Sequence, residues 1–177
     1  FQDPENSVVA KRIKRSEGPF FQFLYLVHKI ITLLFTGKKI NFGNYSCLTK
    51  NDVKKLSSKA SLWSSYSGSV KKNIRALNEI DSIRGERYFG PSKMSLYRLI
   101  IHSFSIIAVF KYQVLTRSIL LILIIGYLNT NFAFSLILFQ TLIILFCIAI
   151  FLVSLRENKE ELFNSENNLE NFNDVTH

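Results

Sequence analysis

Two arginines, a serine and a lysine near the middle of the chain form the set of side chains best suited to chemistry. Arg84, Arg87, Ser92 and Lys93 lie close together in the sequence. A guanidinium group binds a phosphate through two parallel hydrogen bonds, and a serine hydroxyl adds a further donor. Gly90 lets the backbone approach a ligand closely. This set predicts a phosphate site, and the alternative is non-specific attraction to lipid headgroups.

A second basic cluster lies near the N-terminus. Residues 7–10 form a short apolar run that is typical of the end of a strand, and residues 11–15 form a dense basic turn after it. From such a loop, Arg12 and Arg15 can contact a diphosphate or a phosphate. For the two lysines of this turn we expect mainly non-specific attraction to headgroups.

Residues 118–155 carry no charge and are rich in Ile, Leu and Phe. A single helix of this length would be about 57 Å long, nearly twice the ~30 Å hydrocarbon core of a bilayer. Because polar residues 129–131 interrupt the stretch, we expect a transmembrane hairpin over residues 112–155. Its first arm, residues 114–128, is short and must borrow length from the residues before it. The alternative is one long span with a buried or re-entrant segment.

Basic residues flank the hairpin on both sides, with Lys111 and Arg117 at its start and Arg156 and Lys159 after it. By the positive-inside bias, both ends of the hairpin lie in the cytoplasm. We therefore expect a multi-pass protein of the inner, or plasma, membrane with both termini cytoplasmic.

Charge is distributed unevenly along the chain. Residues 1–117 carry 20 Lys or Arg against seven Asp or Glu, whereas residues 156–177 carry two against six. A basic segment beside a span is drawn to anionic lipid at about 1 kcal/mol per cation. Nucleic acid is the usual rival partner, but it would need a basic face without an attached hairpin, so none is expected. We expect the acidic tail to be cytoplasmic and disordered.

Residues 92–111, directly before the hairpin, have the pattern of an interfacial amphipathic helix. Ser95, Arg98, His102 and Ser105 recur at helical spacing and form one polar stripe on an otherwise apolar surface. Such a helix would hold the preceding residues against the membrane surface, with His102 facing the headgroups. The alternative is a core helix of a soluble domain.

Local signals place the remaining elements. Pro19 and Gly37 bound an apolar helix, which we expect to be too short, and with Lys29 too charged, to span. It would pack against a sheet or lie in the interface. Thr49 and Asp52 resemble a capping box that opens a further helix. Residues 40–48 alternate poorly but are rich in residues that favour turns and strands. Residues 62–75 are expected to be helical and partly buried, and residues 78–84 to form a short strand or an extended segment.

Cysteine and histidine give no sign of a disulfide or a zinc site. Cys47 falls in the expected cytoplasmic part and Cys147 inside the second span, and the three histidines are far apart. We expect the cysteines to be packing residues.

Three segments, in order, resemble signatures of one family. Residues 84–93 resemble the R-x-x-G-x-S-K signature that ends the catalytic domain of family-2 glycosyltransferases of the dolichol-phosphate mannose synthase type, which act on polyprenyl phosphates. Residues 12–18 are similar to the R-x-x-R-x-E-G loop of that family, and residues 41–45 to its D-x-G-D-F segment. In the family the R-x-x-G-x-S-K signature leads into an interfacial helix and paired membrane helices, and the same order is expected here after residues 84–93.

The resemblance covers residues 8–155 and implies an α/β remnant of a nucleotide-sugar transferase domain. Residues 1–91 would be the C-terminal part of that catalytic domain. The activity implied is transfer of a sugar from a nucleotide-sugar donor to a polyprenyl phosphate at the cytoplasmic face, in the making of a cell-envelope glycan. The residues implied to bind phosphate or lipid are Arg12, Arg15, Arg84, Arg87, Ser92 and Lys93.

Two departures from the family affect the catalytic assignment. The D-x-D motif of its donor half is missing, because no two aspartates lie two positions apart. Residues 2–5 resemble the family's segment after that motif, but too few residues separate them from Arg12 to hold the helix and strand that the family has there. A divalent cation, Mg²⁺ or Mn²⁺, is therefore expected only through an absent N-terminal half, with no metal ligand in this chain. Asn41 and Asn44 stand where the family has aspartates, and an amide cannot act as a base. The catalytic residues stay unassigned.

These departures favour a rival reading. As part of such an enzyme, the chain, which begins with Phe1, would be a fragment that is inactive alone; the rival is a non-catalytic membrane module, a remnant or a partner subunit. Such a module would bind anionic lipid through its basic face and assemble, for example as a homo-oligomer, through its hairpin.

Overall fold

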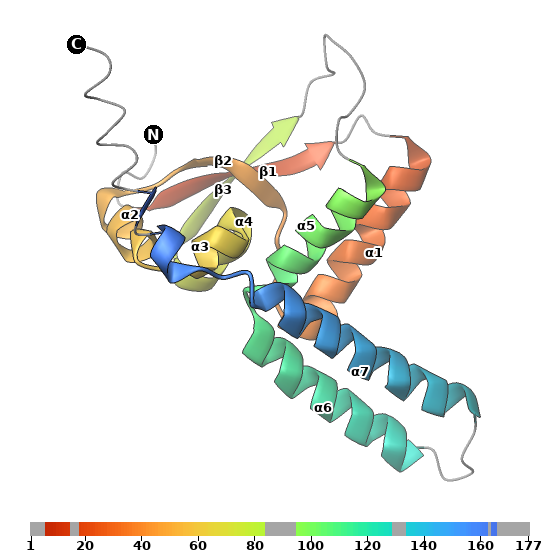
Figure 1. Ribbon diagram of the computed structural model, residues 1–177. Helices are drawn as coiled ribbons and strands as arrows, with labels where there is room; N and C mark the ends of the chain where they lie inside the picture. The colour runs from red at the N-terminus through yellow and green to blue at the C-terminus, as the bar shows by residue number, and fades with distance from the viewer. Residues whose placement is uncertain (1–5, 15–17, 84–94, 129–133, 163, 166–177) are drawn as a thin grey trace, which may run out of the picture.

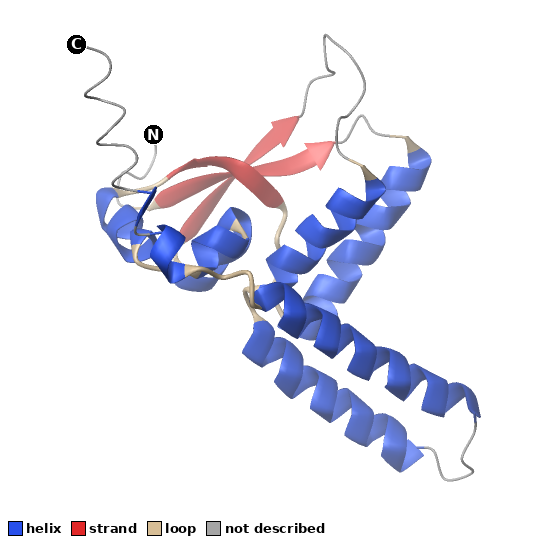
Figure 2. Ribbon diagram, in the orientation of Figure 1, coloured by secondary structure: helices blue, strands red, loops and turns tan. Residues whose placement is uncertain are grey.

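The chain folds into a mixed α/β structure that is mostly helical, with one small sheet and three long apolar helices (Figure 1). The computed structural model describes residues 6–14, 18–83, 95–128, 134–162 and 164–165. Figure 2 shows the sheet at one end and the long helices extending away from it.

The sheet has three strands in the order β2-β1-β3. The central strand β1 (Ser7–Lys14) pairs antiparallel with β2 (Phe42–Cys47) and parallel with β3 (Leu77–Ile83). The expectation that the strand ends near residue 10 is wrong, because pairing with β3 continues as far as Lys14. The basic positions 11–14 therefore belong to a strand and not to a turn.

Three short helices, α2 (Lys50–Ser57), α3 (Ser61–Ser64) and α4 (Tyr66–Asn73), lie along one face of the sheet (Figure 1). Alternation along β1 buries Val9 on this face, as expected for a half-buried strand. The core beneath it comprises Val9, Ile40, Phe42, Leu56, Val70, Ile74, Ile106, Val109 and Phe110. Since the last three belong to α5 (Leu96–Ala108) and the turn after it, the same core joins the sheet to the long apolar helices.

The predicted cap at Thr49 is confirmed, but it closes differently from a capping box. The Asp52 backbone N–H donates to Thr49 Oγ1 at 3.3 Å. The Thr49 backbone N–H donates to Ser7 Oγ at 3.0 Å, and Ser7 Oγ donates to Asp52 Oδ2 at 2.6 Å. Ser7 thus takes the place that the carboxylate would fill, and this relay ties α2 to the start of β1.

Helix α1 (Pro19–Thr36) lies beside α5 (Leu96–Ala108), and the pair runs across the base of the long hairpin (Figure 1). The predicted end of α1 at Gly37 is confirmed: Gly37 adopts φ 69° and its N–H donates to Leu33 O. The expectation that this helix is too short and too charged to span is wrong, because its 18 residues are long and apolar enough to cross a membrane. In the fold, however, it packs against α5 and α6.

Helices α6 (Lys111–Leu128) and α7 (Phe134–Ser154) form the hairpin that the uncharged stretch predicts. As expected, α6 gains length from the residues before Val114. Gln140 Nε2 donates to the Ile122 carbonyl at 3.1 Å, which satisfies the amide between the two helices. Both helices are long and apolar enough to cross a membrane, and their large side chains, such as Leu123 and Phe139, point outward and are exposed.

Candidate functional site

Arg12, near the end of β1, is the predicted phosphate ligand whose position the structure describes. Its backbone N–H donates to the Asn41 carbonyl at 3.0 Å, which holds the strand against the approach to β2. Its guanidinium rests against Gly43, because a Cβ added at Gly43 would lie 2.5 Å from Arg12 Nη2. The glycine therefore provides the space that the guanidinium occupies.

Breaks in strand register lie on both sides of Arg12. The pairing of β1 with β2 shifts between Val9 and Lys11, and that with β3 shifts between Arg12 and Lys14. Such irregularities bend a strand and redirect a side chain from the regular alternation. The irregular part of β1 is the part that carries its basic residues.

The ends of β1 and β3 that precede the basic motifs lie together in the sheet. Because β1 and β3 are parallel, their C-terminal ends lie together, and Lys14 pairs with Ile83. The predicted site residues Arg15, Arg84, Arg87, Ser92 and Lys93 lie outside the described residues. The described strands show only that Lys14 and Ile83, the residues directly before positions 15 and 84, are paired.

Lys11 is engaged within the sheet. Its ammonium nitrogen lies 3.6 Å from Asp81 and 3.9 Å from Glu79, both on β3. These carboxylates offset the charge of Lys11, whereas Arg12 has no carboxylate partner among the described residues. The neighbouring cations therefore differ in their availability for an anionic ligand.

His102, on α5, lies within electrostatic range of Arg12. Desolvation lowers the pKa of His102, and the positive charge of Arg12 lowers it further, although His102 is exposed on α5. The imidazole is therefore neutral at neutral pH. This interaction connects the strand that bears Arg12 to the helix expected at the membrane surface.

The polar stripe of α5 divides into separate roles. Ser95 caps the helix by accepting the Arg98 N–H at 3.3 Å. Ser105 is buried, and its carbonyl accepts a hydrogen bond from Ser64 Oγ at 3.2 Å. The stripe therefore turns partly toward α3 and does not face headgroups along its whole length.

Asn41 and Asn44 lie at the start of β2 and on it, respectively. The Asn41 carbonyl is committed to Arg12, and Asn44 is exposed on the strand. Neither side chain can remove a proton from an acceptor. A phosphate acceptor is already anionic and needs no base.

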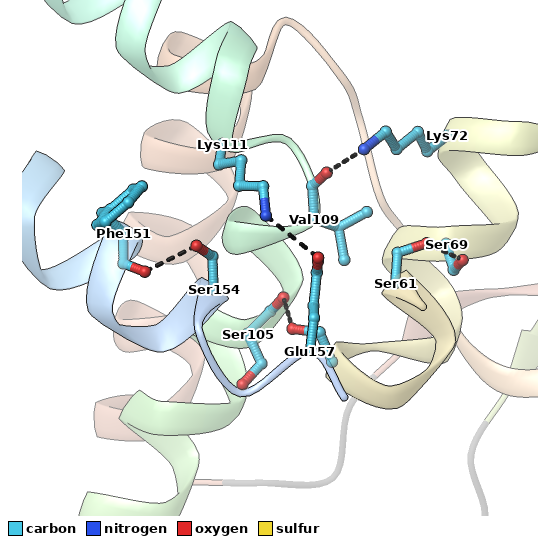
Figure 3. Close-up of polar contacts among 10 residues, drawn as sticks. Ser61, Ser69, Lys72, Ser105, Val109, Lys111, Phe151, Ser154 and Glu157 are labelled. Carbon is cyan, nitrogen blue, oxygen red and sulfur yellow. Dashed lines mark hydrogen bonds and ion pairs between the residues drawn. The ribbon is translucent and has the colours of Figure 1, made fainter. Parts of the chain in front are cut away.

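The junction between the hairpin and the sheet unit is held by a polar network (Figure 3). Lys111, at the start of α6, lies 3.2 Å from Glu157 beyond the end of α7. Lys72 of α4 donates to the Val109 carbonyl at 2.6 Å. Burial lowers the pKa of Lys72; the charge of Glu157 counteracts this and that of Lys111 adds to it.

Arg117 makes the corresponding connection to α1. Its Nη1 donates to the Leu34 carbonyl at 3.1 Å, near the end of α1. Its guanidinium also lies against Gly37, where a Cβ would stand 2.5 Å from Nη2. The sequence identifies Arg117 only as a basic residue that flanks the hairpin, because its role in holding α1 depends on a contact between distant parts of the chain.

Sequence reasoning also missed a basic groove at the end of the hairpin. Arg98, His102 and Arg156 line it together with Ser64 and Val153. The polar stripe indicated the first two residues. In the sequence Arg156 indicates only which end of the hairpin lies in the cytoplasm. Its position as the first charge after the second span is the signal that could have placed it in the groove.

The described residues do not supply a metal site. Within the ranges given above, no three His, Cys, Asp or Glu side chains come together in a group that could hold a metal ion. The described residues therefore supply no ligand set for a divalent cation, which the family resemblance places with an N-terminal half outside this chain.

Comparison with known proteins adds no relative: no family model matches the chain, and neither a curated protein nor a solved structure matches it.

Proposed function

We propose that this chain is the acceptor-binding and membrane part of a glycosyltransferase that passes a sugar from a nucleotide donor to a polyprenyl phosphate. The observation that carries the proposal is the shared sheet edge. Lys14 pairs with Ile83, and Arg12 on the same strand rests on Gly43, so the two strands that precede the basic motifs end together. A single anionic ligand at this edge could be contacted from both.

The chemistry requires mainly the positioning of anions. An oxygen of the lipid phosphate forms a bond to the anomeric carbon of the sugar as the bond from that carbon to the nucleoside diphosphate breaks, with inversion. Fixed guanidinium groups reduce the repulsion between the acceptor phosphate and the diphosphate leaving group. Arg12 suits this role because no carboxylate offsets its charge within the described part of the chain.

The membrane arrangement brings the acceptor to the same place. In this proposal α6 and α7 span the inner membrane with both ends cytoplasmic, while α1 and α5 lie in the interface. Large apolar side chains exposed on α1 and α5, including Phe23, Ile30 and Ile100, support this placement. The sheet edge then lies at the depth where a lipid phosphate emerges from the bilayer.

A transfer assay tests the proposal. Membranes that carry the full-length gene product would receive labelled nucleotide sugars and polyprenyl phosphate, and labelled glycolipid would be measured. Loss of one charge-assisted contact costs about 1.5–3 kcal/mol, so Arg12→Gln should lower transfer about 10- to 100-fold. Lys38→Gln removes an equal charge from an exposed position and should leave transfer nearly unchanged. Absence of lipid-dependent transfer with any donor would overturn the proposal.

A non-catalytic lipid-binding subunit is the second candidate. Asn41 and Asn44 favour it, because both stand where the resembled family has carboxylates. This candidate predicts phosphate-dependent lipid binding with no sugar transfer in the same membranes. The two measurements together therefore distinguish the candidates.

A further inference from the structure

A basic groove opens where α5 passes the C-terminal end of α7. Its volume is about 590 Å³, and its lining includes Arg98 and His102 from α5, Val153 from α7, Arg156 just beyond it and Ser64 from α3. Three separate parts of the chain therefore contribute to one concave surface.

The charge of this groove is not offset locally. No carboxylate in the described part of the chain forms an ion pair with Arg98 or Arg156, and both residues are exposed. Glu157, which directly follows Arg156 in the sequence, is already paired with Lys111. The two guanidinium groups are therefore available to a ligand, and each can bind a phosphate through two hydrogen bonds.

The groove lies at a defined level of the proposed hairpin. Val153 belongs to the last turn of α7, and Arg156 is the first charged residue after that span. Lipid phosphates lie at this boundary between the apolar core and water. Tyr97, also in the lining and largely exposed, is of the amphipathic type that gathers at the same level.

We infer that this groove binds the anionic headgroup of a bilayer phospholipid, with its phosphodiester between Arg98 and Arg156. The groove lies near the proposed acceptor site, since the charge of Arg12 reaches His102, but Arg12 rests on Gly43 in the sheet and is not part of the groove lining. Bound lipid would bridge α5 to the end of α7 and so hold the interfacial helix to the span. The inference needs α7 to span the membrane and does not depend on sugar transfer.

Lipid selectivity measures the site directly. The full chain would be placed in phosphatidylcholine nanodiscs, and the association of spin-labelled phosphatidylglycerol would be compared with that of spin-labelled phosphatidylcholine. The double variant Arg98→Gln/Arg156→Gln should lower the preference for phosphatidylglycerol by about fivefold for each arginine. The control Lys54→Gln/Lys59→Gln removes the same charge from exposed positions in and just after α2 and should keep the preference.

Further arms separate the sources of phosphate. Excess inorganic phosphate should not displace the labelled lipid, and displacement would show that the groove binds a free anion. Polyprenyl phosphate should not displace it either, and displacement would show that the groove binds the acceptor lipid. Either result overturns the inference, as does an unchanged preference in the arginine variant or an equal loss in the control. Emission of Trp63, the single tryptophan, checks folding, and Arg98→Lys/Arg156→Lys should retain most of the preference if glutamine is not tolerated.

Discussion

Gly43 provides the surface on which the guanidinium of Arg12 lies. A Cβ at this glycine would stand 2.5 Å from Arg12 Nη2, and the next closest atom would be Arg12 Cζ at 3.2 Å. Both atoms belong to the far end of a flexible side chain. A larger residue at position 43 would therefore move the arginine without disturbing the backbone.

Gly43→Ala should separate ligand binding from stability. We expect displacement of the Arg12 guanidinium to weaken binding of polyprenyl phosphate about tenfold, while the free energy of unfolding changes by less than about 1 kcal/mol. Lipid binding and thermal unfolding in nanodiscs measure the two quantities. Gly126→Ala, whose Cβ would meet Gln140 at 3.4 Å, is the matched control and should change neither. Unaltered binding in Gly43→Ala would show that the guanidinium position is unimportant.

Ser7→Ala should destabilise the contact between α2 and β1. The change removes the donor to Asp52 and the acceptor of the Thr49 N–H, both in a buried setting, and should cost about 1–3 kcal/mol. Thermal unfolding at neutral pH measures this loss, and Ser57→Ala, at an exposed serine, should have little effect. Equal stability of the Ser7 variant and the parent would contradict the relay.

Acid should weaken the same contact. The Ser7 hydrogen bond, together with Lys55 and Thr49, lowers the pKa of Asp52 from 3.8, although burial opposes this shift. The folded state then binds the Asp52 proton less tightly than the unfolded state, so this stabilisation is complete above pH 3.8 and is lost as the pH falls through the folded pKa. Asp52→Asn should show a smaller dependence of stability on pH in this range.

Removing Arg12 should raise the pKa of His102. Burial is the larger cause of the lowered pKa and the Arg12 charge the second, so Arg12→Gln should bring the value part of the way back toward 6.5. NMR titration of labelled histidines measures it. Because folding favours the neutral imidazole, its contribution to stability is complete above pH 6.5 and is lost as the pH falls through the folded pKa. An unchanged pKa of His102 in Arg12→Gln would show that the charge of Arg12 does not act on α5.

Glu157→Gln should loosen the junction at the base of the hairpin. The Lys111–Glu157 pair is only partly exposed, at 26% and 17% of the two side chains, so leaving Lys111 unpaired should cost about 1–3 kcal/mol. Thermal unfolding in nanodiscs measures the loss, and Glu161→Gln, at an exposed position, is the control. A loss of the same size in both variants would indicate a general charge effect.

The long helices could be predicted because their signals are local. The absence of charge over residues 118–155 sets the hairpin, and Pro19 with Gly37 sets the limits of α1. The prediction that α1 is too short and too charged to span is wrong on both grounds, because 18 residues with the single charge of Lys29 are long and apolar enough to cross a membrane.

The site could be predicted only in part, because its geometry depends on distant pairing. The sequence predicts that Lys11 is attracted to lipid headgroups, yet Glu79 and Asp81 from β3 offset its charge. The continuation of β1 through its basic residues likewise depends on β3, since no apolar alternation marks those positions. Arg12 and Gly43 belong to two separate motifs in the sequence, and only the fold shows that one rests on the other.

Binding of polyprenyl phosphate to the full-length protein in nanodiscs, compared with binding of the uncharged polyprenol, tests the central claim most directly. We expect the parent protein to prefer the phosphate about tenfold or more, and Arg12→Gln to lose most of that preference while Lys38→Gln keeps it. Equal binding of the two lipids by the parent protein, or a preference unchanged by Arg12→Gln, would contradict the account.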